Sequence, residues 1–385
     1  MKVLVELSKG RIPVKMWIDH IEENALIQVR NLANLPFAFR QIAIMPDCHC
    51  GYGMPIGSVL ATDGVIIPNA VGADIGCGMS AIRFNLTELS REFLKVIMGQ
   101  IREQIPVGFN HRGIESPELM PQLPMGKVTE REYALACKQL GTLGGGNHFI
   151  EIQKGSDGFI WVMVHSGSRK LGKQVCDYYN ELAVDLNERW FSSVPIKQEL
   201  AFLPIETSEA KAYKTEMDYC LAFSTANRNL MMRDIALIFY SVLNVVPVEH
   251  INIQHNYARW ENHFGKNVIV HRKGATSARL GEVGIIPGSQ GTKSYIVKGK
   301  GNLDSFNSCS HGAGRRMGRR QAERELDLAT EIKRLDDQGI LHAIRGKNDL
   351  DEAAGAYKDI AEVMDQQSDL VDIMVELSPL GVIKG

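Results

Sequence analysis

The sequence lacks the features of a secreted protein, a membrane protein or a protein that binds nucleic acid through its overall charge. Its 385 residues carry a net charge of −2, so any contact with nucleic acid has to come from a local basic patch. No segment approaches the roughly 18 consecutive apolar residues of a membrane-spanning helix, and the N-terminus has no long apolar core. We therefore expect a cytoplasmic protein that does not enter a membrane.

Cysteine is sparse and irregularly placed. The seven cysteines form no even framework and no CxxC pair occurs, which disfavours both a disulfide scaffold and a closed structural zinc site. Reduced thiols in a cytosolic enzyme fit this pattern best. The sequence assigns no role to Cys48 and Cys50, which flank a histidine and are either inert or oxidisable.

The chain has an ordinary globular composition, with 44% hydrophobic and 23% charged residues. No repeat, low-complexity run or linker divides it, so residues 1–385 are interpreted as one large globular domain. We expect an α+β fold with a β-sheet-rich core and flanking helices. Helix patterns occupy residues 18–35, 90–104, 175–190, 209–240, 321–335 and 360–377, and strand patterns occupy 41–45, 159–164, 249–257 and 267–300.

Several side chains that bind metals follow apolar segments and stand beside glycines. Three glycines between residues 72 and 78 force a tight backbone, which leaves Asp74 and Cys77 pointing into one small space. His165 ends the buried strand at 159–164, and His255 ends the strand at 249–257. Each of these residues alone is as compatible with a capped turn or a buried core position.

A third donor region follows the glycine run at residues 144–146, whose bare N–H groups could cradle phosphate. Asn147, His148 and Glu151 come next on an expected strand, where alternation places Asn147 and Glu151 on one face and His148 on the other. Together with Asp74, Cys77, His165 and His255, His148 completes a set of five donors. Five donors with a potentially bridging thiolate suit a pair of divalent ions, and they predict a central binuclear metal pocket.

Residues 307–320, NSCSHGAGRRMGRR, place one imidazole, His311, before three small residues and four arginines. Small residues let a ligand approach the backbone, and guanidinium groups suit phosphate oxygens. Alone, the segment is typical of a loop histidine beside a solvated basic helix. Next to a binuclear metal pocket, it predicts nucleotidyl transfer through an attack of the imidazole on phosphorus.

The motifs resemble those of the RNA-splicing ligase RtcB family, and they run in the family's order from about residue 14 to the end of the chain. The chain is shorter than many members, chiefly at 106–135 and 330–355. The matching blocks are MPDCHCGYGMPIGS, VGADIGCGM, GTLGGGNHFIE, HSGSRKLG, HNY, RKGATSAR, IIPGSQGTKSY, SCSHGAGR, AYKD and the terminal KG.

This resemblance implies two Mn²⁺ ions on the five donors and a His311 that takes up GMP from GTP as a phosphoramidate. Thiolate softness alone would favour zinc. Asp47 is expected to lie just behind the metal ligands, and the RNA phosphates are expected to contact Arg169, Lys273, Arg315 and Arg319. The implied guanylate site consists of Asn147, His148, Glu151, His255, Asn256, Pro287, Gly288, Ser289, Ser294, His311, Gly312, Ala313, Gly314, Tyr357 and Lys384.

The implied reaction joins an RNA 3′-phosphate or 2′,3′-cyclic phosphate to an RNA 5′-hydroxyl through an RNA end activated by GMP, in RNA repair or tRNA splicing. An archease-type activator is a further implied partner. Two other functions are compatible with the same residues. One is a binuclear metal phosphodiesterase or phosphatase that acts on RNA ends without a nucleotide, and the other is a silent RNA-binding or metal-storage protein.

Overall fold

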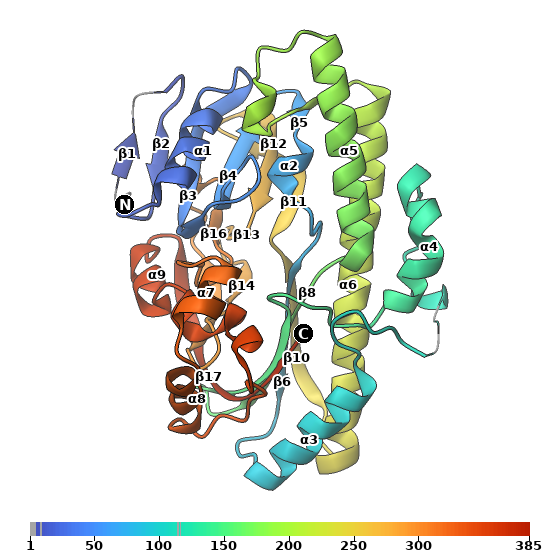
Figure 1. Cartoon of the computed structure of the whole chain (residues 1–385), viewed down its shortest axis with the longest axis vertical. Helices are drawn as coiled ribbons and strands as arrows, with labels where there is room; N and C mark the ends of the chain where they lie inside the picture. Colours follow the sequence, from blue (N-terminus) through green and yellow to red (C-terminus); the bar gives the residue numbers. More distant parts are fainter. Residues whose placement is uncertain (1–4, 8–9, 114, 116) are drawn as a thin grey trace.

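The structure is a computed structural model that describes residues 5–7, 10–113, 115 and 117–385, with the backbone alone for 5–7. Two large sheets form its centre and long helices cover one side (Figure 1). This arrangement confirms the expected α+β fold with a sheet-rich core. The interpretation of residues 1–385 as one domain stays a prediction.

The first sheet has six strands and is antiparallel apart from the parallel pair β2–β3. Strand β3 is long, and it carries the PDCH segment at its C-terminal end. In spatial order the strands are β1 (Val5–Leu7), β2 (Val14–Met16), β3 (Ala38–His49), β4 (Ile56–Thr62), β12 (Lys266–Lys273) and β11 (Asn256–His263).

The second sheet has seven strands, and each neighbouring pair in it is antiparallel. In spatial order the strands are β10 (Pro247–Gln254), β6 (Gly78–Phe84), β8 (Ile160–Ser166), β7 (Phe149–Gly155), β17 (Val371–Lys384), β15 (Ser294–Gly299) and β14 (Val283–Ile286). Two short pairs complete the strands described: β13 (Ala275–Ser277) with β16 (Ser308–Ser310), and β5 (Val65–Ile66) with β9 (Leu203–Pro204).

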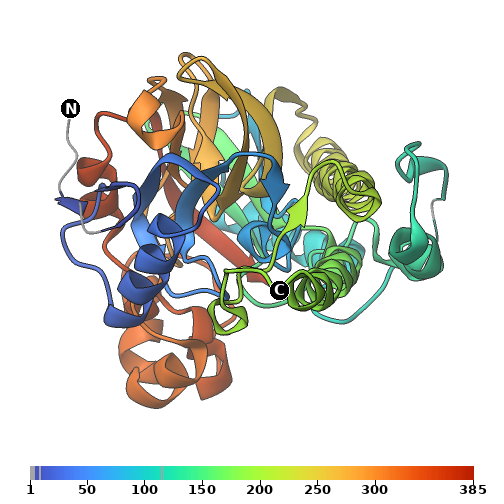
Figure 2. The same ribbon diagram turned by 90° about the horizontal axis from the view of Figure 1, so that it is seen from above.

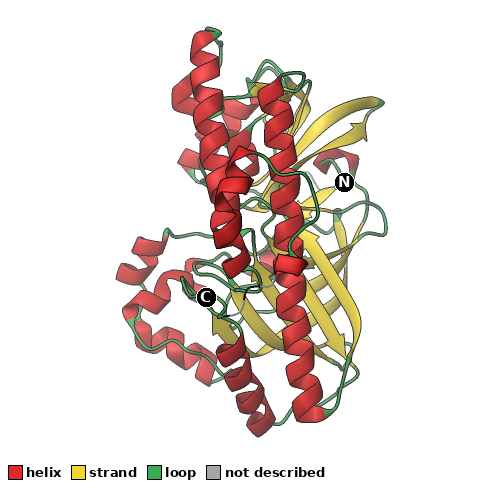
Figure 3. Cartoon of the chain, turned by 90° about the vertical axis from the view of Figure 1, so that its right-hand side faces the viewer, coloured by secondary structure: helices red, strands yellow, loops and turns green. Residues whose placement is uncertain are grey.

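Helices α5 and α6 lie side by side along one side of the sheets (Figures 2 and 3). No helix in the described part of the chain is long and apolar enough to cross a membrane. The described α-helices are α1 (Glu23–Ala33), α2 (Pro68–Val71), α3 (Arg91–Gln104), α4 (Lys127–Gln139), α5 (Arg169–Arg189), α6 (Ser208–Leu243), α7 (Arg319–Glu325), α8 (Leu328–Asp336) and α9 (Ile360–Gln366).

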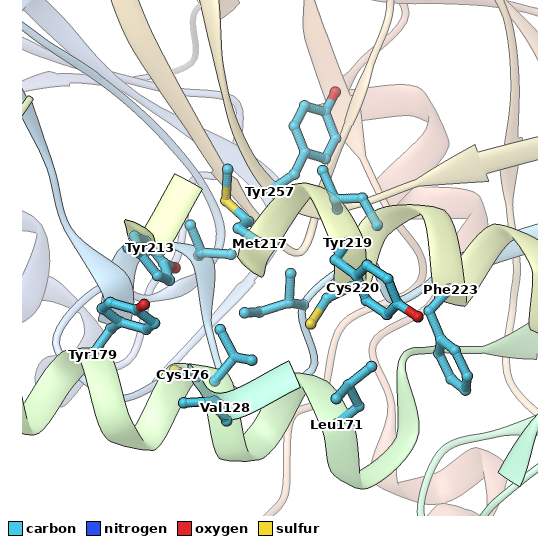
Figure 4. Close-up of a cluster of buried hydrophobic side chains, with 14 of the residues drawn as sticks. Val128, Leu171, Cys176, Tyr179, Tyr213, Met217, Tyr219, Cys220, Phe223 and Tyr257 are labelled. Atoms are coloured by element: carbon cyan, nitrogen blue, oxygen red, sulfur yellow. The ribbon is translucent and has the colours of Figure 1, made fainter. Parts of the chain in front are cut away.

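A large apolar cluster joins α5 and α6 to α2 and α4 (Figure 4). Met217, Cys220 and Phe223 of α6 are fully buried in it, and Tyr179 of α5 packs beside Tyr213 of α6 with ring centroids 5.1 Å apart. Burial of large side chains stabilises the helix pair by about 1.5–3 kcal/mol for each. The helices therefore give a rigid support to the strand ends that they cover.

Several sequence-based assignments are confirmed. Helix α3 begins after Ser90, whose side chain accepts a hydrogen bond from the backbone N–H of Phe93. Strand β8 is buried at every position, as expected of a strand covered on both faces. The helices expected at 175–190 and 209–240 correspond to α5 and α6.

Other assignments are wrong. The helix expected at 360–377 ends at Gln366, because Val371, Ile373, Val375 and Leu377 alternate with a period of two and enter β17. The helix expected at 321–335 is two helices, and the second begins after Asp327, whose carboxylate accepts from the Thr330 N–H.

Three further assignments near the glycine-rich segments are also wrong. Strand β3 continues through Asp47 to His49, which therefore lie on a strand and not in a loop. Strand β7 begins only at Phe149, so the expected alternation of faces does not include Asn147 and His148. The strand expected at 249–257 is interrupted at His255 between β10 and β11.

Candidate active site

The register of the seven-stranded sheet brings the five predicted metal donors together. Gly78, which follows Cys77, pairs with both Ser166 and Gln254, and these residues adjoin His165 and His255. Phe149, which follows His148, pairs with His165 itself. Because β10, β6, β8 and β7 are neighbours, the donors meet at one end of adjacent strands.

The donors form two groups that share the Cys77 thiol. Cys77, His165 and His255 form one group, and Asp74, Cys77 and His148 form the other, with the ligand atoms of each group within 4.8 Å of one another. The Cys77 Sγ lies 3.2 Å from His165 Nε2 and 3.6 Å from His148 Nε2. Ligands at about 2.0–2.3 Å from one ion stand about 3.3–3.8 Å apart in a tetrahedron. These residues therefore fit two ions with a common sulfur.

Hydrogen bonds turn two of the imidazoles toward the shared thiol. His148 Nδ1 lies 2.9 Å from the Leu143 carbonyl oxygen, and His165 Nδ1 lies 2.9 Å from that of Asn147. A carbonyl can only accept, so each Nδ1 carries a proton and each Nε2 faces the thiol. His255 Nδ1, in contrast, has no hydrogen-bond partner among the described residues.

The charge states of the donors also suit cation binding. Burial, with His148 nearby, lowers the pKa of His165 to about 3, so its ring is neutral. Burial alone would raise the pKa of Asp74, but a hydrogen bond from His148 Nε2, 3.1 Å away, lowers it to about 2 and the carboxylate is ionised. An ion bound at this group has to displace the proton between them. Burial raises the pKa of the Cys77 thiol, so ion binding has to displace its proton.

His311 follows β16 and faces the metal donors, with its ring centroid 4.8 Å from that of His255. The buried Asp47 Oδ2 accepts from three donors: His311 Nδ1 at 2.6 Å, His311 N at 3.0 Å and Gly312 N at 3.2 Å. An ionised carboxylate only accepts, so His311 Nδ1 carries a proton and Nε2 is the ring nitrogen left to react.

The state of Asp47 is fixed by its neighbours. Burial alone would raise its pKa, but the His311 imidazole and the Lys358 ammonium hold the pKa below its usual value. Lys358 also donates to the carbonyl oxygens of Pro46 and Cys48 at 3.0 and 2.6 Å, which fixes this end of β3. Asp47 thus supports His311 directly, whereas the sequence interpretation placed it behind the metal ligands.

His311 lines two cavities. The larger one, of about 590 Å³, is also lined by Asp74, Cys77 and His255 and is called the metal-side cavity below. The smaller one, of about 160 Å³, extends along Gly312–Gly314 to Tyr357 and is called the glycine-lined cavity below. It adjoins a third cavity of about 40 Å³, and the two share the lining residues Asn147, Gly288 and Tyr357.

Most residues predicted for guanylate binding line these cavities. The smallest cavity includes Glu151, whose carboxylate accepts from Gln153 and whose pKa burial raises to about 8. Ser294 lies behind the wall, where its hydroxyl accepts from the Gly288 N–H at 3.1 Å. The residues on the two smaller cavities are Asn147, Glu151, Pro287, Gly288, Ser289, His311, Gly312, Ala313, Gly314, Tyr357 and Lys384. Three other residues predicted for guanylate binding lie among the metal donors or on the metal-side cavity, namely His148, His255 and Asn256.

The basic residues predicted for RNA contact already have protein partners. Arg315 and Arg319 line the glycine-lined cavity of about 160 Å³. Both form ion pairs with the buried Glu352 carboxylate, at 2.8 and 2.9 Å. Lys273 lines the metal-side cavity and donates to the carbonyl oxygens of Tyr52 and Asn69.

Arg169 has a different position. Its guanidinium donates to the Gly108 carbonyl oxygen at 3.3 Å, and it packs beside the His148 ring, 3.4 Å from Nδ1. The side chain is held against the Gly144 backbone, where a Cβ would meet the guanidinium.

The sequence interpretation missed three residues of the site. Glu352 holds both arginines and accepts from the Tyr357 hydroxyl, but no motif surrounds it. His49 lines the glycine-lined cavity. It lies two residues after Asp47 on one strand, and this spacing predicts that the two side chains share a face. Lys173 lines the metal-side cavity from α5, where its helical pattern reveals nothing.

Comparisons with known proteins agree with the motifs. The family model of tRNA-splicing ligase RtcB matches residues 28–122 and 112–385. The chain is 38% identical to the RNA-splicing ligase RtcB of Escherichia coli K12, over 98% of this chain and 99% of that protein.

Relatives from archaea match over the same extent. The chain is 31% identical to the tRNA-splicing ligase RtcB of Methanococcus maripaludis, over 97% of this chain and 95% of that one. It is 30% identical to the tRNA-splicing ligase RtcB of Thermococcus kodakarensis, over 98% and 96% of the two chains.

Proposed function

The chain belongs to the RtcB family, and from this premise we propose that it is an RNA ligase. It joins an RNA 3′-phosphate or 2′,3′-cyclic phosphate end to a 5′-hydroxyl end, with GTP and Mn²⁺, in RNA repair or tRNA splicing. One observation carries the proposal. The His311 ring lies between the donor set with the shared thiol and the glycine-lined cavity, and its Nε2 is free.

Two Mn²⁺ ions are proposed on the five donors that meet at the strand ends. The fit rests on the two groups with a common sulfur and on the neutral, oriented imidazoles. Bound there, the ions would polarise phosphate oxygens and offset the charge that develops on them. The metal identity comes from the family resemblance, since a thiolate ligand by itself favours zinc.

In the first proposed step, His311 Nε2 attacks the α-phosphorus of GTP. An N–P bond forms, the bond to the bridging oxygen breaks, and pyrophosphate leaves. The negative charge of Asp47 stabilises the imidazole as it becomes positive, and its hydrogen bond to Nδ1 keeps the ring in one orientation.

The two smaller cavities carry the side chains proposed to bind the nucleotide of that step. Tyr357 offers a ring for stacking the guanine, and Gly312 and Gly314 leave room for the α-phosphate. Glu151 is protonated at neutral pH and provides both a donor and an acceptor for the base edge. Lys384 closes the cavity through a hydrogen bond to the Gly146 carbonyl oxygen.

In the later steps the RNA ends react in turn. Water first opens a cyclic end to a 3′-phosphate by breaking the bond to the 2′-oxygen. An oxygen of that phosphate then attacks the phosphorus on His311, which releases the imidazole and leaves a pyrophosphate-linked GMP on the RNA. Finally the 5′-hydroxyl attacks the RNA phosphorus, the 3′,5′-phosphodiester forms, and GMP leaves.

A ligation assay tests the proposal. Protein is incubated with a 3′-phosphate RNA, a labelled 5′-hydroxyl RNA, GTP and Mn²⁺, and the expected result is a joined strand. His311→Ala should give none, whereas the matched control His20→Ala, at an exposed histidine, should ligate normally. Ligation by the His311 variant would contradict the assigned nucleophile. Opening of cyclic ends without GTP and without joining would favour the phosphodiesterase.

The setting and partner are part of the same proposal. All seven cysteines are free thiols, which supports a cytoplasmic setting. An archease-type activator, if it acts here, should raise the number of turnovers in the ligation assay without changing the product.

A further inference from the structure

The metal-side cavity has a wall that the proposed chemistry does not use. Besides the metal donors and His311, its lining includes Tyr52, Lys173 and Asn180. Its volume of about 590 Å³ lies within the range of about 300–1,000 Å³ that ligand sites occupy. A bound nucleotide can therefore extend beyond the reacting phosphate toward this wall.

Tyr52 stands out on this wall because its side chain is 75% exposed although it lines a cavity. Large aromatic side chains are usually buried in a core. An exposed ring at the edge of a reaction cavity offers a flat apolar face to whatever enters.

The backbone around Tyr52 is held in place. Its carbonyl oxygen accepts from Lys273 Nζ at 2.6 Å and from the Met54 N–H at 2.7 Å. The next residue, Gly53, donates to the Glu199 carboxylate at 2.9 Å. The backbone that carries the ring is therefore fixed, so stacking has to order only the side chain.

Polar side chains on the same wall offer further contacts to a nucleotide. Lys173 and Lys273 line the cavity together with the carboxylates of Asp177 and Glu199, and Lys173 pairs with Asp177. The amide oxygen of Asn180 is buried there and accepts no hydrogen bond within the described part of the chain. An unused acceptor and an aromatic face are among the parts from which single-stranded RNA sites are built.

We propose that Tyr52 stacks on the terminal nucleobase of an RNA end whose reacting group faces His311, and that Asn180 accepts a hydrogen bond from the same nucleotide. This inference rests on the proposed ligase function, and it names a residue that positions the substrate. Stacking tolerates every base because each has a π-face. Tyr52 therefore holds the end in place without selecting a sequence.

The test measures stacking directly. The fluorescent adenine analogue 2-aminopurine, which is quenched when it stacks, is placed at the terminal nucleotide of a 3′-phosphate RNA and, separately, of a 5′-hydroxyl RNA. Protein loaded with Mn²⁺ is titrated into each RNA without GTP. Wild-type protein and Tyr52→Phe, which keeps the ring, should quench at least one of the two ends.

Tyr52→Ala should abolish the quench and weaken binding of that RNA about 5- to 150-fold, the range that loss of one base–aromatic stack implies. An RNA with an abasic terminal nucleotide should bind wild type and Tyr52→Ala equally. The matched control is Phe191→Ala, which removes an aromatic side chain that is 93% exposed and lies just beyond α5, and it should behave as wild type.

The test distinguishes a failure of the proposed ligase function from a failure of the stacking inference. If wild-type protein takes no label from GTP and joins no RNA, the proposed function fails. If wild type ligates, but Tyr52→Ala quenches and binds both ends as wild type does, only this inference is overturned. An equal loss with the abasic RNA would also overturn it, because the ring would then act without a base.

Discussion

Replacement of Asp47 by Asn tests how the nucleophile is oriented. Asp47 Oδ2 accepts from His311 Nδ1 and from the backbone N–H groups of His311 and Gly312. Backbone donors cannot turn away, so the Asn amide oxygen has to take the place of Oδ2 and its NH₂ group the place of Oδ1. His311 then still donates from Nδ1, and Nε2 stays free. Only the negative charge is lost.

The magnitude follows from that geometry. A hydrogen bond to a charged group contributes about 1.5–3 kcal/mol, and a neutral one about 0.5–1.5 kcal/mol. A difference of about 1–2 kcal/mol lowers the rate about 5- to 30-fold. Asp47→Leu, in contrast, leaves three donors without an acceptor and lets the ring turn, so its loss should exceed about 100-fold.

Asp47→Asn should also be less stable than the wild-type protein. Asp47 Oδ1 is buried without a hydrogen-bond partner in the described residues, so an NH₂ group there would be an unsatisfied donor. Its burial should lower the free energy of unfolding by about 1–3 kcal/mol. A melting curve at one Mn²⁺ concentration measures this effect separately from the chemistry.

The assay is rapid-quench labelling of the protein by GTP that carries ³²P at the α-phosphate. Glu261→Gln is the matched control, because Glu261 is also a buried carboxylate beside a histidine, His263, at 2.9 Å. It should destabilise the fold yet label at the wild-type rate. Equal losses for Asp47→Asn and Asp47→Leu, or full labelling by Asp47→Asn, would refute the reasoning.

Three other outcomes are expected. Cys77→Ser should lower the Mn²⁺ content at both sites in metal analysis, since both donor groups include its sulfur; loss of one ion alone would contradict a shared ligand. Glu151 has a pKa raised to about 8 by burial, so the folded state holds its proton more tightly than the unfolded state and wild-type stability falls as pH rises from about 5 to 8. Glu151→Gln should therefore gain melting temperature relative to wild type over that window, and a constant difference would count against the raised pKa. Glu216→Leu should cost about 3 kcal/mol in denaturant unfolding, because the buried carboxylate accepts from the Thr129 N–H and the Tyr179 hydroxyl; a loss under about 1 kcal/mol would rule out that role.

Four of the five donors could be predicted from the sequence because each lies within two residues of a glycine, whereas His255 has no glycine neighbour. Glycine-rich turns restrict where Asp74, Cys77 and His165 can point. The pairing that brings them together could not be predicted, because β6, β8 and β10 are far apart in the chain and register depends on tertiary packing.

The role of Asp47 shows a second limit. Sequence reasoning placed it just behind the metal ligands but did not predict its contact with His311, which lies 264 residues later in the chain. Glu352 is a third case, since a lone carboxylate in a short 3₁₀ helix has no local signal. The C-terminal strand β17 was missed because its Val371–Leu377 half follows closely on α9, although apolar residues occupy every second position there.

The most direct test of the central claim is a map of the covalent adduct. Protein incubated with GTP and Mn²⁺ is digested at neutral pH, and the peptides are fragmented in a mass spectrometer. We predict that the mass of GMP lies on His311 and is attached through Nε2. GMP on another residue, or on Nδ1 of His311, would contradict the account.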